Sequence, residues 1–145
     1  MCLIPKNLHF RVYNDIQSAR VATRNILVWK VLDSCTGTIG YSPYRGAKWV
    51  LGRSRTAQMR MNLRPDGKIE RGLHAFMSKY AAAKRVEMMS GTSYHPAIIP
   101  VGSRIWFGMD GDVAADEMIV FENMVDLKVV YGKITKPMKY TTLTE

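Results

Sequence analysis

The chain has 145 residues, of which 47% are hydrophobic and 10% aromatic. This length and composition predict one folded domain over residues 1–145 that buries roughly 70% of the surface its unfolded chain exposes. The net charge of +9 favours an anionic partner. No stretch approaches the ~18 apolar residues of a membrane span, and the N-terminus lacks the pattern of a secretory signal. We therefore expect a cytoplasmic protein with no membrane partner.

The N-terminal third predicts an arm followed by a central strand. Residues 1–25 are expected to form this arm with a short helix beginning at Asp15, a residue type that caps helices. Residues 26–32 are β-branched, aromatic and almost continuously apolar, which is typical of a strand covered on both faces. Residues 33–40 are expected to form a loop.

The middle of the chain predicts a second strand and one main helix. The strand covers residues 47–51, and a proline-containing turn is expected at 64–67. The helix covers about 78–90, since Ser78 is a favourable N-cap, the following residues are alanine-rich, and Gly91 stands where a C-terminal cap belongs.

The C-terminal third predicts further short strands and a polar tail. Alternation of apolar and polar residues indicates strands rather than helices here. The expected strands are 97–99, 103–108, 118–121 and 125–131, and the tail is 133–145. The fold class is thus α+β, a mostly antiparallel sheet with one main helix, and the core is expected at 26–132.

Positive charge is concentrated in one fifth of the chain. Residues 45–71 include eight basic residues and only two acidic ones, Asp66 and Glu70, so this stretch carries +6 of the net charge of +9. Arginine binds phosphate through two parallel hydrogen bonds and stacks on flat rings. The basic residues are Arg45, Lys48, Arg53, Arg55, Arg60, Arg64, Lys68 and Arg71. This basic stretch predicts a nucleotide-like anionic ligand.

Aromatic residues stand beside the first of these arginines. Tyr41 and Tyr44 flank a proline, and Arg45 follows directly. A tyrosine that stacks on a base beside an arginine that binds phosphate is typical of single-stranded nucleotide sites. The alternative is an ordinary turn whose tyrosines seal the edge of the core. With Lys48 and Arg53, these residues form the first part of the candidate site.

His74 completes the candidate site. A strand that leads directly into a helix N-terminus places His74 near backbone N–H groups and the Ser78 hydroxyl, which together could bind a phosphate. His74 could bind that phosphate, or act as a general acid or base. The alternative is a core histidine that hydrogen-bonds a carbonyl.

Other reactive groups give weaker patterns. The carboxylates Asp110, Asp112, Asp116 and Glu117 do not have the spacing of a calcium loop, and Asp110-Gly111 is typical of a hairpin turn. We therefore expect no metal, and no motif indicates a cofactor.

The two cysteines have no metal-ligand spacing and are expected to stay reduced. Cys2 could be an N-terminal nucleophile or a buried anchor, and Cys35 could pair with His74 or His95.

Four short motifs carry a resemblance to known proteins. They lie at residues 29–32, 42–44, 72–76 and 99–103, and the chain resembles small single-domain proteins that are common in phage genomes. Phage proteins of this size are often counter-defence factors, and some sequester or cleave nucleotide signals of bacterial immunity, such as cyclic dinucleotides and ADP-ribose derivatives. The resemblance implies such a role in the cytoplasm of the host cell.

A fainter resemblance is to ADP-ribosyltransferase-like domains. Residues 29–32, 72–76 and 78–89 would be the corresponding strands and helix. The first strand lacks the expected arginine or histidine, and Glu117 is only a nominal match for a catalytic glutamate, so transferase activity does not follow.

Three functions are consistent with these residues. The favoured one is sequestration of a nucleotide signal by Tyr41, Tyr44, Arg45, Lys48, Arg53, His74 and Ser78. The second is a metal-independent phosphodiesterase with His74 as acid or base and Arg45 stabilising the developing charge. The third is a basic nucleic-acid-binding surface without a pocket. A homo-oligomer is compatible with each.

Overall fold

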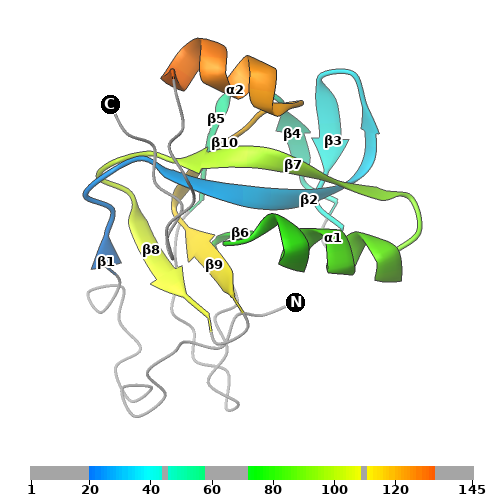
Figure 1. Ribbon diagram of the computed structural model, residues 1–145, viewed down its shortest axis with the longest axis horizontal. Helices are drawn as coiled ribbons and strands as arrows, with labels where there is room; N and C mark the ends of the chain where they lie inside the picture. Colours follow the sequence, from blue (N-terminus) through cyan, green and yellow to red (C-terminus); the bar gives the residue numbers. More distant parts are fainter. Residues whose placement is uncertain (1–19, 44–45, 58–71, 109–110, 133–145) are drawn as a thin grey trace.

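The computed structural model describes residues 20–43, 46–57, 72–108 and 111–132. Within these residues, ten strands form one sheet and two helices pack on it (Figure 1). The strands are β1 (Arg20–Val21), β2 (Ile26–Thr36), β3 (Ile39–Tyr41), β4 (Lys48–Val50), β5 (Ser54–Thr56), β6 (Leu73–Phe76), β7 (Thr92–Ile99), β8 (Arg104–Phe107), β9 (Asp112–Ala115) and β10 (Glu117–Val120). The helices are α1 (Lys79–Met88) and α2 (Met124–Tyr131).

The sheet runs in the order β1-β8-β9-β6-β2-β7-β10-β5, and the β3–β4 hairpin pairs with the far end of β2. Every pair of strands is antiparallel. The prediction of an α+β fold with a mostly antiparallel sheet is therefore confirmed. In Figure 1, β8 and β9 descend steeply from the long β2–β7 ribbon, so the sheet is strongly twisted.

The central strand is β2, which pairs with β7 over eight residues from Ile26 to Asp33. Its two faces serve different clusters, because alternate side chains of a strand point to opposite sides. Val28 and Leu32 lie in the main hydrophobic core. Leu27 lies on the other face, in a smaller cluster with Leu127 of α2.

The expected loop at 33–40 is wrong. β2 continues to Thr36 and turns through Gly37 and Thr38 into β3. Gly37 has φ of +61°, a conformation that two-residue hairpin turns use and glycine adopts easily. Gly40 then passes close to Leu32, whose Cδ1 would lie 2.8 Å from an added Cβ.

Helix α1 confirms the main predicted helix. Ser78 is its N-cap, and the Ser78 hydroxyl oxygen accepts a 3.1 Å hydrogen bond from the Ala81 N–H. Ala82 is completely buried, since the small side chain allows the helix to approach the sheet closely. α1 contacts β2, β7 and β6.

Residues 125–131 form a helix, not the predicted strand. Their alternation of apolar residues is misleading, because positions four apart also lie on one helix face. Asn123 caps α2 by accepting a 2.9 Å hydrogen bond from Asp126 N–H. Leu127 is completely buried, whereas Val125 and Val129 are exposed. The Asn123 cap and the burial of Leu127 therefore determine that residues 125–131 form a helix.

Other predicted elements are found with shifted ends. The strand at 47–51 is β4, and that at 97–99 is the end of β7, which continues through Pro96. The strands at 103–108 and 118–121 correspond to β8 and β10. Of the predicted N-terminal arm and helix, only residues 20–25 are described, and there Arg20–Val21 form strand β1 rather than helix. The turn at 64–67 and the tail at 133–145 lie outside the described residues. None of the described helices is long and apolar enough to cross a membrane.

Candidate ligand pocket

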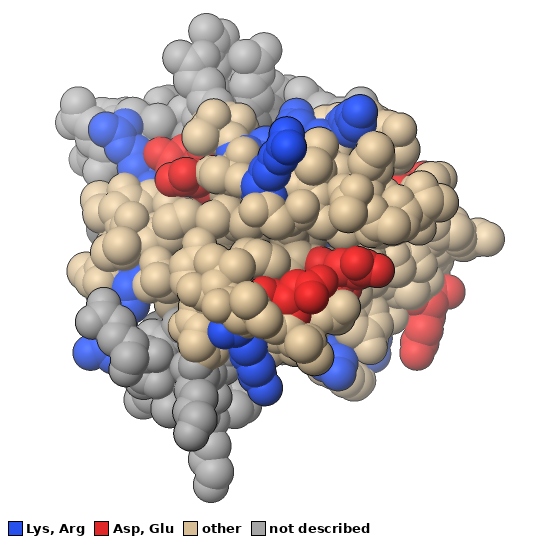
Figure 2. Space-filling model, turned by 90° about the horizontal axis from the view of Figure 1, so that it is seen from above, with Lys and Arg blue, Asp and Glu red and all other residues tan. Residues whose placement is uncertain are grey.

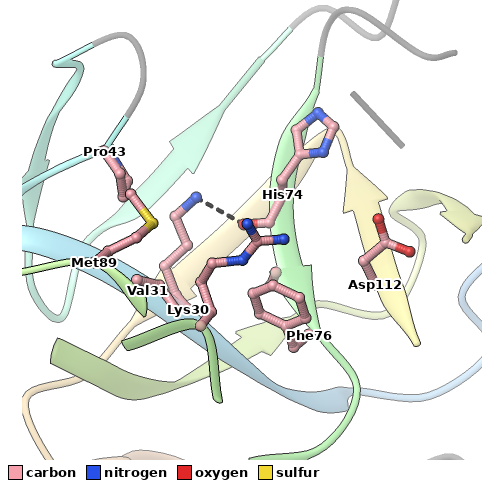
Figure 3. Close-up of a pocket in the computed structure, with 9 residues that line it drawn as sticks. Lys30, Val31, Pro43, His74, Phe76, Met89 and Asp112 are labelled. Atoms are coloured by element: carbon pink, nitrogen blue, oxygen red, sulfur yellow. Dashed lines mark hydrogen bonds between the residues drawn. The ribbon is translucent and has the colours of Figure 1, made fainter. Parts of the chain in front are cut away.

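The strands β2 and β6 separate beside a buried lysine. Their pairing consists of a single register position, Trp29 opposite Phe76. Beyond it, the Nζ atom of Lys30 donates a 2.7 Å hydrogen bond to the main-chain oxygen of His74 (Figure 3). The lysine amine thus satisfies a carbonyl that has lost its neighbouring strand, which a buried backbone oxygen requires.

Lys30 is buried within the main core face of β2, with 6% of its surface exposed. Its Nζ lies 5.2 Å from the centre of the Trp49 ring, and the Arg55 guanidinium carbon lies 5.3 Å from the same ring. Burial, followed by the charge of Arg55, lowers the pKa of Lys30 to about 8. No carboxylate of the described residues pairs with this amine.

A pocket opens where the two strands separate. It contains about 480 Å³ of space between atoms, including its mouth, of which about 70 Å³ can hold the centre of a water molecule. It is lined by Lys30, Val31, Pro43, His74, Ala75, Phe76, Arg85, Met89 and Asp112. The enclosed part is large enough for a compact group such as a phosphate, and a larger ligand would extend into the mouth.

The pocket wall combines cations with an aromatic ring. The Arg85 guanidinium carbon, from α1, lies 5.8 Å from the centre of the Phe76 ring. In Figure 3 the Lys30 amine points at the main chain of His74, while the His74 ring points away from it and Asp112 lies on the far side of β6. Lys30 and Arg85 give the pocket two cationic walls, a feature that favours an anionic ligand.

The predicted site residues are only partly brought together. His74 lines the pocket, and so does Pro43, which directly precedes Tyr44 and Arg45 in the sequence. Tyr44 and Arg45 themselves lie outside the described residues. Tyr41 and Lys48 face each other across the β3–β4 hairpin, and both are exposed.

Two more predicted residues lie away from the pocket lining. Arg53 is exposed in the turn before β5. The Ser78 oxygen caps α1, so that part of its hydrogen-bonding capacity is used within the helix. Their binding to a ligand stays a prediction.

The basic stretch is described only at Lys48, Arg53 and Arg55. Of these, Arg55 lies over Trp49 and donates a hydrogen bond to the main-chain oxygen of Lys48. Figure 2 shows the face above α2, where Lys and Arg groups are separated by uncharged surface and by acidic groups. On this face, the described residues therefore present no continuous basic surface of the kind that a nucleic acid follows.

Sequence reasoning missed the two cations that line the pocket, Lys30 and Arg85. A signal for Lys30 exists, since it is a single charged residue inside the apolar run 26–32, where a charge is costly to bury. Arg85 gives no such signal, because arginine is common on exposed helix faces.

The acidic and thiol groups of the described part of the chain were the basis of the alternative sites. Among the described residues, no group of three or more His, Cys, Asp and Glu side chains could hold a metal. Glu117 instead accepts a 2.6 Å hydrogen bond from the Ser54 hydroxyl. Burial, followed by the charge of Glu122, raises the pKa of the Cys35 thiol, which disfavours a thiolate nucleophile. Cys2 lies outside the described residues.

Comparison with known proteins adds no family: no family model, no curated protein and no solved structure matches this chain.

Proposed function

We propose that the protein binds a nucleotide-like anion, with a phosphate group held between Lys30 and Arg85 in the pocket beside β6. One observation carries the proposal: the Lys30 amine is buried next to a pocket, and no carboxylate among the described residues neutralises it. A bound anion would supply that missing charge in a low-dielectric site, where the interaction is stronger than in water.

The rest of the nucleotide would lie at the mouth of the pocket. Pro43 forms part of its lining, and Tyr44 and Arg45 follow directly in the chain. In this proposal Tyr44 stacks on the base and Arg45 makes a second phosphate contact. The biological role we propose is sequestration of a nucleotide immune signal, a cyclic dinucleotide or an ADP-ribose derivative, by a phage counter-defence protein.

Titration calorimetry on Lys30→Met tests the proposal, with cyclic dinucleotides, ADP-ribose and inorganic phosphate as ligands. Loss of a charge-assisted phosphate contact should cost roughly 1.5–3 kcal/mol of binding free energy, which corresponds to about 10- to 150-fold weaker binding. Lys128→Met is the matched control, because Lys128 is exposed on helix α2 and is not part of the pocket lining. Wild-type affinity in Lys30→Met, with the fold intact by circular dichroism, would refute the proposed site.

Cleavage is the second candidate, because His74 and Asp112 line the same pocket and could act as acid and base. Mass spectrometry of the ligand after incubation and heating distinguishes the two functions. A ligand that is depleted from solution and then released intact by heating indicates sequestration, whereas a linear product indicates a phosphodiesterase. A ligand that is never depleted indicates neither of these functions. In the second case, His74→Ala should lower turnover by about 10²–10⁴-fold while the ligand still binds.

A further inference from the structure

A serine and a histidine on β7 are hydrogen-bonded in the order that nucleophilic catalysis requires. The Ser93 Oγ and the His95 Nε2 are 2.7 Å apart, and the His95 Nδ1 is 3.1 Å from the main-chain oxygen of Glu122. Ser93 and His95 are two residues apart on one strand, so their side chains leave the same face.

The chemistry of these partners fixes the histidine tautomer. A carbonyl oxygen only accepts hydrogen bonds, so the Nδ1 of His95 must carry the proton that it donates to Glu122. In the neutral ring the Nε2 is then an acceptor, and the Ser93 hydroxyl donates to it. A hydroxyl that donates to a base, and a base oriented by a third group, are the general features of an activated nucleophile.

Neither Ser93 nor His95 lines the ligand pocket, although His95 is the cross-strand neighbour of Lys30 on the same face of the sheet. Lys30 lies opposite His95 in the register of β2 and β7. The Lys30 amine, however, reaches toward β6, whereas the His95 ring reaches toward the chain that leaves β10, and these strands lie on opposite sides of β2 and β7. Among the described strands, β10 pairs with β7 only at Ala97 and Ile98. The β10 ladder therefore does not extend to Ser93.

Burial also suits the two roles. His95 is 8% exposed, so its ring is held in one orientation, while Ser93 is only half-buried. The Ser93 hydroxyl is partly exposed and can meet a reactant. This distinguishes the pair from a histidine that only fills the core.

We propose that Ser93 is a nucleophile activated by His95 and that the pair hydrolyses small activated carboxylic esters. The Ser93 Oγ attacks the ester carbonyl carbon, and its proton passes to the His95 Nε2. The ester C–O bond breaks, and the leaving alcohol takes that proton. A water molecule then attacks the acyl carbon and gives a proton to the His95 Nε2. The bond between the acyl carbon and the Ser93 Oγ breaks, Ser93 takes that proton back, and the carboxylic acid is released. The orienting group is a neutral carbonyl, which stabilises an imidazolium less than a carboxylate does, so esters with good leaving groups are the expected substrates.

The test is labelling of the full chain with a fluorophosphonate, which reacts with activated serines, followed by peptide mass spectrometry. Ser54 is an internal control, because its hydroxyl is also hydrogen-bonded, but its acceptor is the carboxylate of Glu117 and not a histidine ring. We expect the adduct at Ser93 to form at least about 100-fold faster than at Ser54. Labelling of Ser93 no faster than Ser54 in the wild-type chain would overturn the proposal without any variant.

Variants then assign the roles. Ser93→Ala should abolish the adduct and the release of p-nitrophenol from p-nitrophenyl acetate. His95→Gln should slow labelling of Ser93 by about 10²–10⁴-fold, and its melting temperature shows whether it is folded. Ester hydrolysis that persists in Ser93→Ala would assign the activity to another group and refute the pair.

Discussion

The Lys30 amine and the His74 carbonyl, 44 positions apart in the chain, are joined by a 2.7 Å hydrogen bond. This contact bridges β2 and β6 just beyond their one paired position, so a side chain takes over where the backbone ladder ends. The same separation creates the pocket, and the lysine is at once a structural link and a cationic group in the lining of that pocket.

The buried lysine should make stability depend on pH. Its pKa is about 8 in the folded chain and 10.5 when unperturbed, so between these values the unfolded chain holds a proton that the folded chain has lost. Unfolding takes up that proton, and the free energy of unfolding therefore rises with pH through this window. Across this window, the free energy of unfolding of the wild type should rise by roughly 3 kcal/mol relative to that of Lys30→Met, at 1.36 kcal/mol per pKa unit.

Urea denaturation of both proteins at pH 7.0, 8.5 and 9.5 measures this difference. Other titrating groups are common to both chains and largely cancel. A difference in stability that does not change with pH would show that the Lys30 amine stays charged in the fold.

The affinity for an anion should decrease above about pH 8. The neutral amine cannot neutralise a phosphate, so binding above this pH requires uptake of a proton. We expect the dissociation constant to rise by up to tenfold per pH unit from pH 8 to 10. Calorimetry in buffers of different ionisation enthalpy should detect the proton. In Lys30→Met the dependence should disappear, and its persistence there would assign the titration to another group.

Leu127 should be the main anchor of helix α2, because it is the one completely buried residue of this helix. Leu127 is completely buried in the cluster with Leu27, Ile98 and Phe121. Leu127→Ala should therefore destabilise the protein by about 2–5 kcal/mol. Val129→Ala, at a position that is 81% exposed in the same helix, should change stability by less than about 0.5 kcal/mol. Equal effects in thermal denaturation would contradict the packing of α2.

The cap of α1 should be separable from ligand binding. Ser78→Ala removes the acceptor for the Ala81 N–H and should cost about 1 kcal/mol of stability, whereas Ser78→Asp, which can still cap, should retain it. If the hydroxyl also contacts the ligand, as the sequence predicts, both variants should weaken binding in calorimetry. Unchanged affinity in both would limit Ser78 to the cap.

Much of the fold could be predicted because local sequence determines it. The β-branched run from Ile26 to Leu32 specifies a strand, and Ser78 with the alanine-rich segment after it specifies a helix start. The net charge and the basic stretch predicted an anionic ligand. His74, one of the predicted ligand residues, lines the candidate pocket, and its binding to a ligand stays a prediction.

Residues 125–131 could not be assigned in the same way. Their apolar residues fit a strand of period two and, at every fourth position, a helix face. The Asn123 cap and the burial of Leu127 against Leu27 and Ile98 select the helix, and the second of these exists only in the folded chain.

The site depended still more on tertiary structure. The sequence by itself determined the strands, the caps and the excess of positive charge, since these follow from neighbouring residues and composition. It did not determine that Lys30 would be the buried cation. Trp49 shields Lys30 from water, and His74 accepts its hydrogen bond. Both residues come from distant parts of the chain and meet Lys30 only when β2, β4 and β6 assemble. Burial and charge pairing are properties of that assembly, and so the pocket was decided by the fold alone.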